Sequence, residues 1–141
     1  MADPGDSLRV LAVQLRGEDT PISAHVVDPV EEPFFGPVAA AGPRAAASPG
    51  DYALAVESAR EGYLLHYGEP RILAGYDSDL ALLAGDYLYA LGIERLAALG
   101  DSLAMHALAE LISRCAQLHT EAREDDVPPL WQATAAKIAG G

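Results

Sequence analysis

Histidine and cysteine side chains are the first candidates for catalysis or metal binding, because they titrate or coordinate near neutral pH. The chain has four histidines, His25, His66, His106 and His119, and one cysteine, Cys115. His106 and His119 are 13 residues apart on one predicted helix, which turns them about 220° from each other. They cannot share a metal ion on a straight helix. Cys115 falls on the apolar side of that helix, a position typical of an inert core thiol.

Carboxylates that could hold magnesium are not clustered in this sequence. Magnesium chemistry on diphosphates needs several carboxylates on one helical face. The one adjacent aspartate pair, Asp125-Asp126, is followed by Val127-Pro128-Pro129 and by no third acid. We therefore predict no catalytic residue, no cofactor-binding residue and no metal ligand in this chain.

Asp86 is the only charged residue of the apolar segment 80–93, and we predict that it is a buried polar residue. A buried carboxylate needs a hydrogen-bonding or cationic partner, or it takes up a proton. Asp79 lies seven residues earlier, and we interpret it as a first-turn acid favoured by the helix dipole. Several tyrosines could line a ligand pocket, although their helical spacing is more typical of half-buried core positions: Tyr52, Tyr63, Tyr67, Tyr87 and Tyr89.

Four helices are predicted from residue 48 onward. Ser48-Pro49 favours a helix start, and Gly68 with Pro70 ends that helix. Its apolar stripe follows steps of three or four residues, with the glutamates at 57 and 61 facing elsewhere. The later helices are predicted at residues 78–99, 102–121 and 130–139.

Residues 1–47 form a predicted Pro-rich N-terminal arm, and residues 48–141 a helical domain. Six prolines interrupt the arm, so residues 25–38 cannot form a long helix, while residues 8–15 could be a strand or a helical turn. Phe34 and Phe35 predict that the arm docks on its own helices or on a partner. The expected fold is all-α, a small bundle of three to four helices with an extended arm.

The helix at residues 78–99 is apolar around nearly its whole circumference over residues 80–93, which predicts burial on nearly all sides. Gly85 and Gly92 would let another helix backbone approach closely, although each glycine costs roughly 1 kcal/mol of helix propensity. We predict that one face is covered by a second chain; the alternative is the central helix of a compact bundle. The predicted partner interface comprises Leu80, Leu83, Ala84, Gly85, Tyr87, Leu88, Leu91 and Gly92.

The run DSDLALLAGDYLYALGIERLAALGD, residues 77–101, resembles the LAGD helix of the all-α trans-polyprenyl diphosphate synthases. Leu83-Ala84-Gly85-Asp86, followed by Tyr87 and a tail rich in leucine and tyrosine, carries this resemblance. The similarity is greatest to the small, non-catalytic subunits of two-component members such as heptaprenyl and hexaprenyl diphosphate synthase.

The resemblance implies a regulatory subunit, because catalytic members hold Mg²⁺ through two DDxxD-type motifs that this chain lacks. Mg²⁺ is therefore expected on the catalytic partner and no cofactor here. The implied partners are the catalytic large subunit and the apolar tail of a polyprenyl diphosphate, whose elongation channel Leu83, Tyr87 and Leu91 would help to shape. The alternatives are a helical homo-oligomeric adaptor without prenyl chemistry and a small enzyme or apolar-ligand binder that uses Asp86.

The acidic charge of the chain argues against two classes of partner. Its 141 residues carry 21 acids and 9 bases, a net charge of −12, which repels nucleic-acid phosphates and anionic membrane surfaces. The apolar segment 80–93 is shorter than the about 20 residues that cross a bilayer. With one cysteine and no signal-like N-terminus, we expect a cytoplasmic protein without a nucleic-acid partner or a transmembrane segment.

Overall fold

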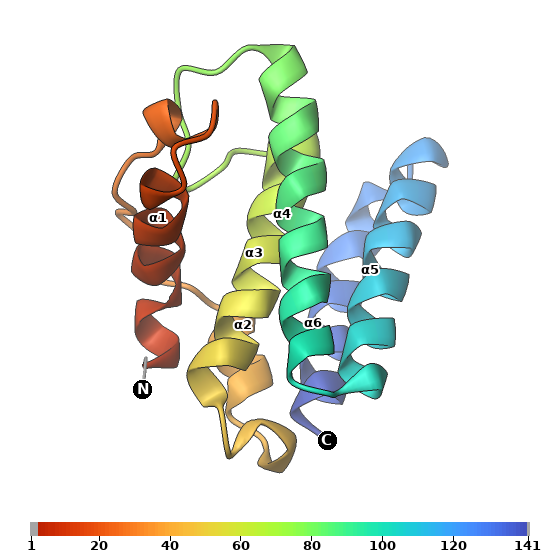
Figure 1. Ribbon diagram of the computed structural model, residues 1–141. Helices are drawn as coiled ribbons and strands as arrows, with labels where there is room; N and C mark the ends of the chain where they lie inside the picture. The colour runs from red at the N-terminus through yellow and green to blue at the C-terminus, as the bar shows by residue number, and fades with distance from the viewer. Residues whose placement is uncertain (1–2, 141) are drawn as a thin grey trace.

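The computed structural model describes residues 3–140, and every regular element within them is helical. The α-helices are α1 (Ser7–Gly17), α2 (Phe35–Ala40), α3 (Pro49–Tyr67), α4 (Ser78–Ala98), α5 (Ser102–Thr120) and α6 (Val127–Ala139). α3 and α4 run antiparallel through the middle of the molecule, with α1 on one side and the antiparallel pair α5 and α6 on the other (Figure 1). The predicted all-α class is confirmed.

The ends of the four later helices follow local sequence signals. α3 begins at Pro49 and ends before Gly68, and Asp77 caps α4 by accepting a hydrogen bond from the Leu80 amide at 2.8 Å. α6 begins three residues earlier than predicted, because prolines in its first turn remove amide donors that have no helical acceptor. None of the helices within residues 3–140 has the length and apolarity that a bilayer crossing requires.

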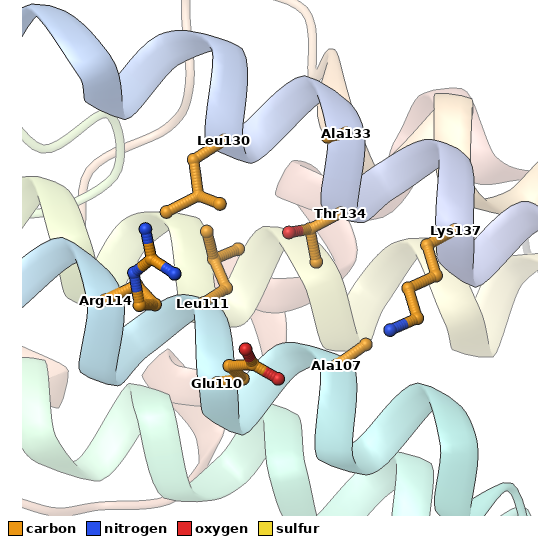
Figure 2. A pocket seen from close by; sticks show the side chains of 8 residues that line it. All are labelled: Ala107, Glu110, Leu111, Arg114, Leu130, Ala133, Thr134 and Lys137. Carbon is orange, nitrogen blue, oxygen red and sulfur yellow. The ribbon is translucent and has the colours of Figure 1, made fainter.

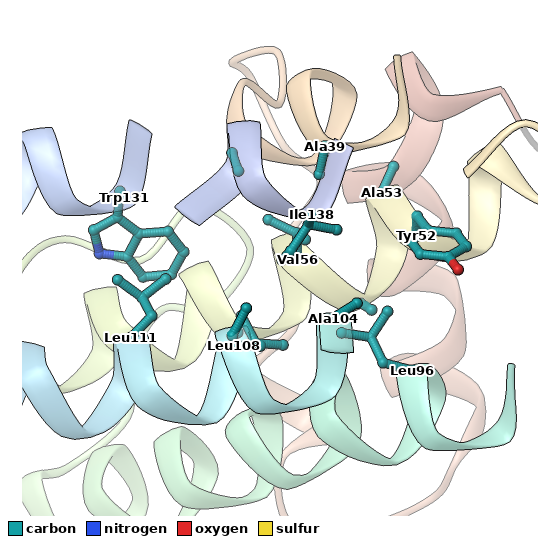
Figure 3. Close-up of a cluster of buried hydrophobic side chains, with 14 of the residues drawn as sticks. Ala39, Tyr52, Ala53, Val56, Leu96, Ala104, Leu108, Leu111, Trp131 and Ile138 are labelled. Carbon is teal, nitrogen blue, oxygen red and sulfur yellow. The ribbon is translucent and has the colours of Figure 1, made fainter. Parts of the chain in front are cut away.

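α3 lies between two apolar clusters and contributes to both. One cluster joins α3 to α2, α5 and α6, and its large buried side chains include Trp131, Leu108 and Ile138 (Figure 3). The other joins α3 to α1 and the inner side of α4. Because both sides are covered, 13 of the 19 residues of α3 are buried.

Close packing of α3 on α4 depends on glycine. A Cβ atom on Gly62 would lie 2.7 Å from the carbonyl oxygen of Gly85, and one on Gly92 would lie 2.6 Å from the carbonyl oxygen of Ala55. Only glycine permits backbones to approach this closely in a helix pair. The close approach predicted for Gly85 and Gly92 is therefore present, and the approaching helix is α3 of the same chain.

The N-terminal segment, which we expected to be extended, contains α1 and α2. Apolar residues of α1 recur at helical spacing, and Leu8, Leu11 and Leu15 are buried in the cluster next to α4. The absence of a long helix over residues 25–38 is confirmed, because only the first part of the six-residue α2 falls there. The segment docks on the chain's own helices, since Phe35 packs against Trp131 with ring centroids 5.5 Å apart.

Candidate functional site

The inner face of α4 is occupied by α3. Ala84, Gly85, Leu88 and Gly92 are all buried, and the Leu88 carbonyl accepts a hydrogen bond from Ser58 Oγ at 2.8 Å. The prediction that these four residues contact a second chain is wrong, because α3 of the same chain packs against them.

The outer face of α4, which we define as Leu82, Leu83, Asp86 and Tyr87, is exposed. The exposed fraction is 58% for Leu82, 66% for Leu83 and 37% for Tyr87. The two remaining predicted interface residues, Leu80 and Leu91, are half-buried at the edge of the cluster shared with α1. Of the predicted interface, Leu83 and Tyr87 are thus the residues most open to a partner, and Leu82 is one that sequence reasoning omitted.

Asp86 is not buried in this chain, and that prediction is wrong. Its side chain is 67% exposed, and Oδ1 lies 3.4 Å from His66 Nε2. The physical reason is that α3 covers the Gly85 and Leu88 side of α4, whereas Asp86 lies at the edge of that side and its carboxylate remains in water. Water solvates the exposed carboxylate, so Asp86 needs no buried partner.

An aromatic cluster fills the space between α3, α5, α6 and α4. Its members are Phe35, Arg60, Tyr63, His66, Tyr67, Tyr89, His119 and Trp131. The guanidinium carbon of Arg60 lies 5.0, 5.2 and 4.9 Å from the ring centroids of Phe35, Tyr63 and Trp131. Such cation–π contacts stabilise the packing and hold the guanidinium in one place.

Two histidines belong to this cluster, and each packs against tyrosine rings. His119 stacks on Tyr67 with centroids 3.9 Å apart, and its Nε2 lies 2.7 Å from the Tyr63 hydroxyl. His66 packs edge-on against Tyr89. His25 ends a short 3-10 helix, and its Nδ1 lies 3.1 Å from the carbonyl oxygen of Ala74. No group of three metal-ligating side chains is found within residues 3–140.

The tyrosine hydroxyls of the cluster and the nearby Cys115 thiol are held in their neutral forms. Burial raises the pKa of the Tyr63, Tyr67 and Tyr89 hydroxyls above the ordinary value. Burial also raises the pKa of the Cys115 thiol to about 11, so the thiol stays protonated at neutral pH and is a poor nucleophile. The tyrosines predicted as pocket candidates do not all lie in one place. Tyr52 and Tyr87 lie outside the aromatic cluster and donate hydrogen bonds to Asp101 and Glu18.

A buried ion network on α3 escaped sequence reasoning. Glu57 and Glu61 are fully buried and both bind Arg71, at 2.6 Å (Oε1 to Nη1) and 2.9 Å (Oε1 to Nε). The second carboxylate oxygen of Glu57 accepts a hydrogen bond from the Gly36 amide at 2.7 Å, and that of Glu61 accepts one from the Ile72 amide at 2.9 Å. The signal in the sequence is that both glutamates share a helical face with the apolar residues at 54 and 65.

A groove runs between α5 and α6 (Figure 2). It has a volume of about 200 Å³, an apolar floor that includes Leu111 and Leu130, and Arg114, Glu110 and Lys137 around its rim. A second depression of about 460 Å³ lies at His66, Tyr67 and Leu82, next to the outer face of α4.

The fold and these surfaces define a small all-α domain in which Leu82, Leu83 and Tyr87 are neighbouring exposed apolar residues on one face of α4. No protein-family model, curated protein or solved structure was found to match the chain.

Proposed function

We propose that this chain is a non-catalytic helical subunit that binds a protein partner through the outer face of α4. The observation that carries the proposal is the exposure of Leu82 and Leu83 in the N-terminal half of α4, a helix whose inner side is fixed on α3. Neighbouring apolar side chains exposed on a rigid element are typical of protein interfaces. Tyr87 adds an aromatic ring, a residue type enriched where interfaces bind most strongly.

The partner that we propose is a catalytic polyprenyl diphosphate synthase subunit. The support is the resemblance of residues 77–101 to the LAGD helix, within which Leu83 and Tyr87 face outward while Ala84 and Gly85 hold the helix on α3. By this proposal Leu83 and Tyr87 close one side of the partner's elongation channel by steric contact with the growing isoprenoid tail. Mg²⁺ and diphosphate chemistry belong to the partner, and the contact is made in the cytoplasm.

The outer face is suited to contact rather than to proton transfer. The Tyr87 hydroxyl donates to Glu18, with oxygen–oxygen distances of 2.9 and 3.0 Å. Burial, followed by this hydrogen bond, raises the pKa of Tyr87, so the phenol stays protonated and its ring is held in place. A fixed aromatic ring beside exposed leucines loses little side-chain entropy on binding.

The test is recovery of the tagged chain from its native host under gentle conditions, followed by identification of any protein present in stoichiometric amount. We expect a companion with two aspartate-rich motifs, and a change in the length of its prenyl product when this chain is omitted. Leu83→Ser should reduce recovery of the companion. Val13→Ser is the matched control, because Val13 is equally exposed but lies on α1.

Recovery of no other protein in stoichiometric amount would contradict the proposal and favour the homo-oligomeric adaptor. A companion without aspartate-rich motifs would contradict the prenyl synthase assignment while leaving the outer face of α4 as the interface, provided that Leu83→Ser still weakens its recovery.

A further inference from the structure

The groove between α5 and α6 carries two cations that form no ion pair with an acid within residues 3–140. Six of the nine basic residues form ion pairs with acids, and Arg60 is held by aromatic rings. Among the residues that the structure describes, this leaves Arg114 and Lys137 without either kind of partner. Both lie on the rim of the same groove (Figure 2). In a chain of net charge −12, two unpaired cations at one groove favour an acidic occupant.

The size of the groove restricts that occupant. Its volume of about 200 Å³ is below the roughly 300–1,000 Å³ of ordinary small-molecule sites. It is large enough for one apolar side chain above Leu111 and Leu130. The occupant is therefore a side chain presented by a protein surface rather than a small molecule.

The spacing of the two cations defines the rest of the occupant. α5 and α6 are antiparallel, so Lys137 is level with Ala107, and Arg114 is level with Leu130 (Figure 2). Ala107 and Arg114 are two helical turns apart, which separates the two positive ends by about 10 Å along the groove. Glu110 lies on the rim between them, so the rim as a whole keeps one negative charge beside two positive ones.

The outer face of α4, together with Asp79 about one helical turn before Leu82, carries the complementary pattern. Asp79 and Asp86 are exposed and seven residues apart, which places them about 10 Å from each other along the helix. Leu83, with 66% of its surface exposed, lies between them. Asp86 also contacts His66 Nε2 at 3.4 Å, at the edge of this face.

We propose that the chain associates head to tail with a second copy of itself. Leu83 of one copy enters the α5–α6 groove of the next, where Asp79 and Asp86 lie against Arg114 and Lys137. Because two different surfaces meet, the contact is heterologous and forms an open chain or a ring rather than a symmetric dimer. This self-association goes beyond the proposed function. Both use the outer face of α4, so a partner bound there prevents a further copy from being added.

The first experiment is sedimentation of the purified full chain over a range of concentrations. We expect the average mass to rise with concentration beyond that of a dimer, or to reach that of a ring of more than two copies. The mass should fall when salt is raised from about 0.05 M to about 0.5 M, because the charge pairs are screened. Mass that stays at the monomer value up to millimolar concentration, or at the dimer value at all concentrations, would overturn the proposal.

Paired variants test the two surfaces separately. Arg114→Glu with Lys137→Glu removes the groove's positive charge, and Leu83→Glu removes the inserted side chain. Each should raise the dissociation constant by about tenfold or more, a factor that corresponds to 1.4 kcal/mol. The control for the groove is Arg16→Glu with Arg123→Glu, which changes net charge equally at exposed positions on other surfaces. This control should change the dissociation constant by less than the groove pair does.

Mixing gives the sharpest outcome. The groove variant keeps a working α4 face, and Leu83→Glu keeps a working groove, so a 1:1 mixture should form a heterodimer that cannot extend. A mixture that stays monomeric while the wild-type chain associates would overturn the head-to-tail geometry. The groove variant leaves the outer face of α4 unchanged, so its failure to weaken self-association would count against the head-to-tail proposal alone. A failure of Leu83→Ser to reduce recovery of the companion would count against the proposed function.

Discussion

α3 and α4 pack against each other through glycine, yet they are stabilised in different ways. α3 is covered on both sides, by α1 and α4 on one and by α2, α5 and α6 on the other. Within it two buried glutamates both form ion pairs with Arg71. α4 is covered on one side only, and its opposite side presents leucines to solvent. The difference shows that the surrounding helices decide whether a helix is buried. Charged side chains are tolerated in the interior where a partner such as Arg71 is present, and apolar side chains stay exposed where no helix covers them.

The largest effect is expected from removing the cation that serves α3. Arg71→Met leaves Glu57 and Glu61 buried without their charge partner, which typically costs about 3–5 kcal/mol in the free energy of unfolding. Since small domains are stable by only about 5–15 kcal/mol, the variant should unfold at much lower urea concentration. Equilibrium unfolding followed by circular dichroism measures this.

The matched control for that variant is Arg123→Met. Arg123 pairs with Asp126 at 2.8 Å, but both side chains are more than half exposed, so the change should be about 0–1 kcal/mol. Equal losses from the two substitutions would show that the buried network does not distinguish α3 from the surface.

The next effect concerns the first turn of α3. The hydroxyl of Tyr52 donates to Asp101 Oδ2 at 2.7 Å in a part-buried hydrogen bond, which ties α3 to the turn between α4 and α5. Tyr52→Phe should cost about 1.5–3 kcal/mol, as expected for a hydrogen bond to a charged group. Urea unfolding at several pH values measures both the loss and its pH dependence.

The pH dependence has a defined sign. Burial and the bond to Asp101 raise the pKa of Tyr52 from 10.0 to about 12. A raised pKa means that the contribution is complete below pH 10 and is lost as the pH rises toward 12. The difference between wild type and Tyr52→Phe should therefore be constant from neutral pH to about 10 and shrink above it. A difference that grows over that interval would contradict the assignment.

The contact between the two helices can be tested at Gly92. Gly92→Ala places a methyl group against the Ala55 carbonyl oxygen, and overpacking of this kind costs about 1–3 kcal/mol, offset by about 1 kcal/mol of helix propensity. We expect a net loss in the free energy of unfolding. The control is Gly17→Ala at the exposed end of α1, where an added methyl group meets no neighbour, and it should be neutral or stabilising by about 0.5–1 kcal/mol.

The helix ends from α3 onward could be predicted because they depend on local residues such as Pro49, Gly68 and Asp77. The covering of α4 could not, because the glycines that signal close approach do not say which helix approaches. For the same reason, the sequence alone predicts that Asp86 is buried. The burial of Glu57 depends on Arg71, which is 14 residues away, and a periodicity argument treats a charged side chain as exposed. In α1, Val10 and Val13 obscured the helical spacing of the buried leucines.

The smallest effect on stability, and the most informative for function, is expected on the outer face of α4. Leu83→Ser removes a side chain that is already 66% exposed, so the free energy of unfolding should change by about 0.5 kcal/mol or less. Leu88→Ala, one helical turn away and fully buried, should instead cost about 2–5 kcal/mol. If Leu83→Ser reduces association while unfolding in urea is unchanged, the exposed leucines serve binding rather than folding. If the two substitutions destabilise the chain equally, the outer face belongs to the core, and the contrast between α3 and α4 fails.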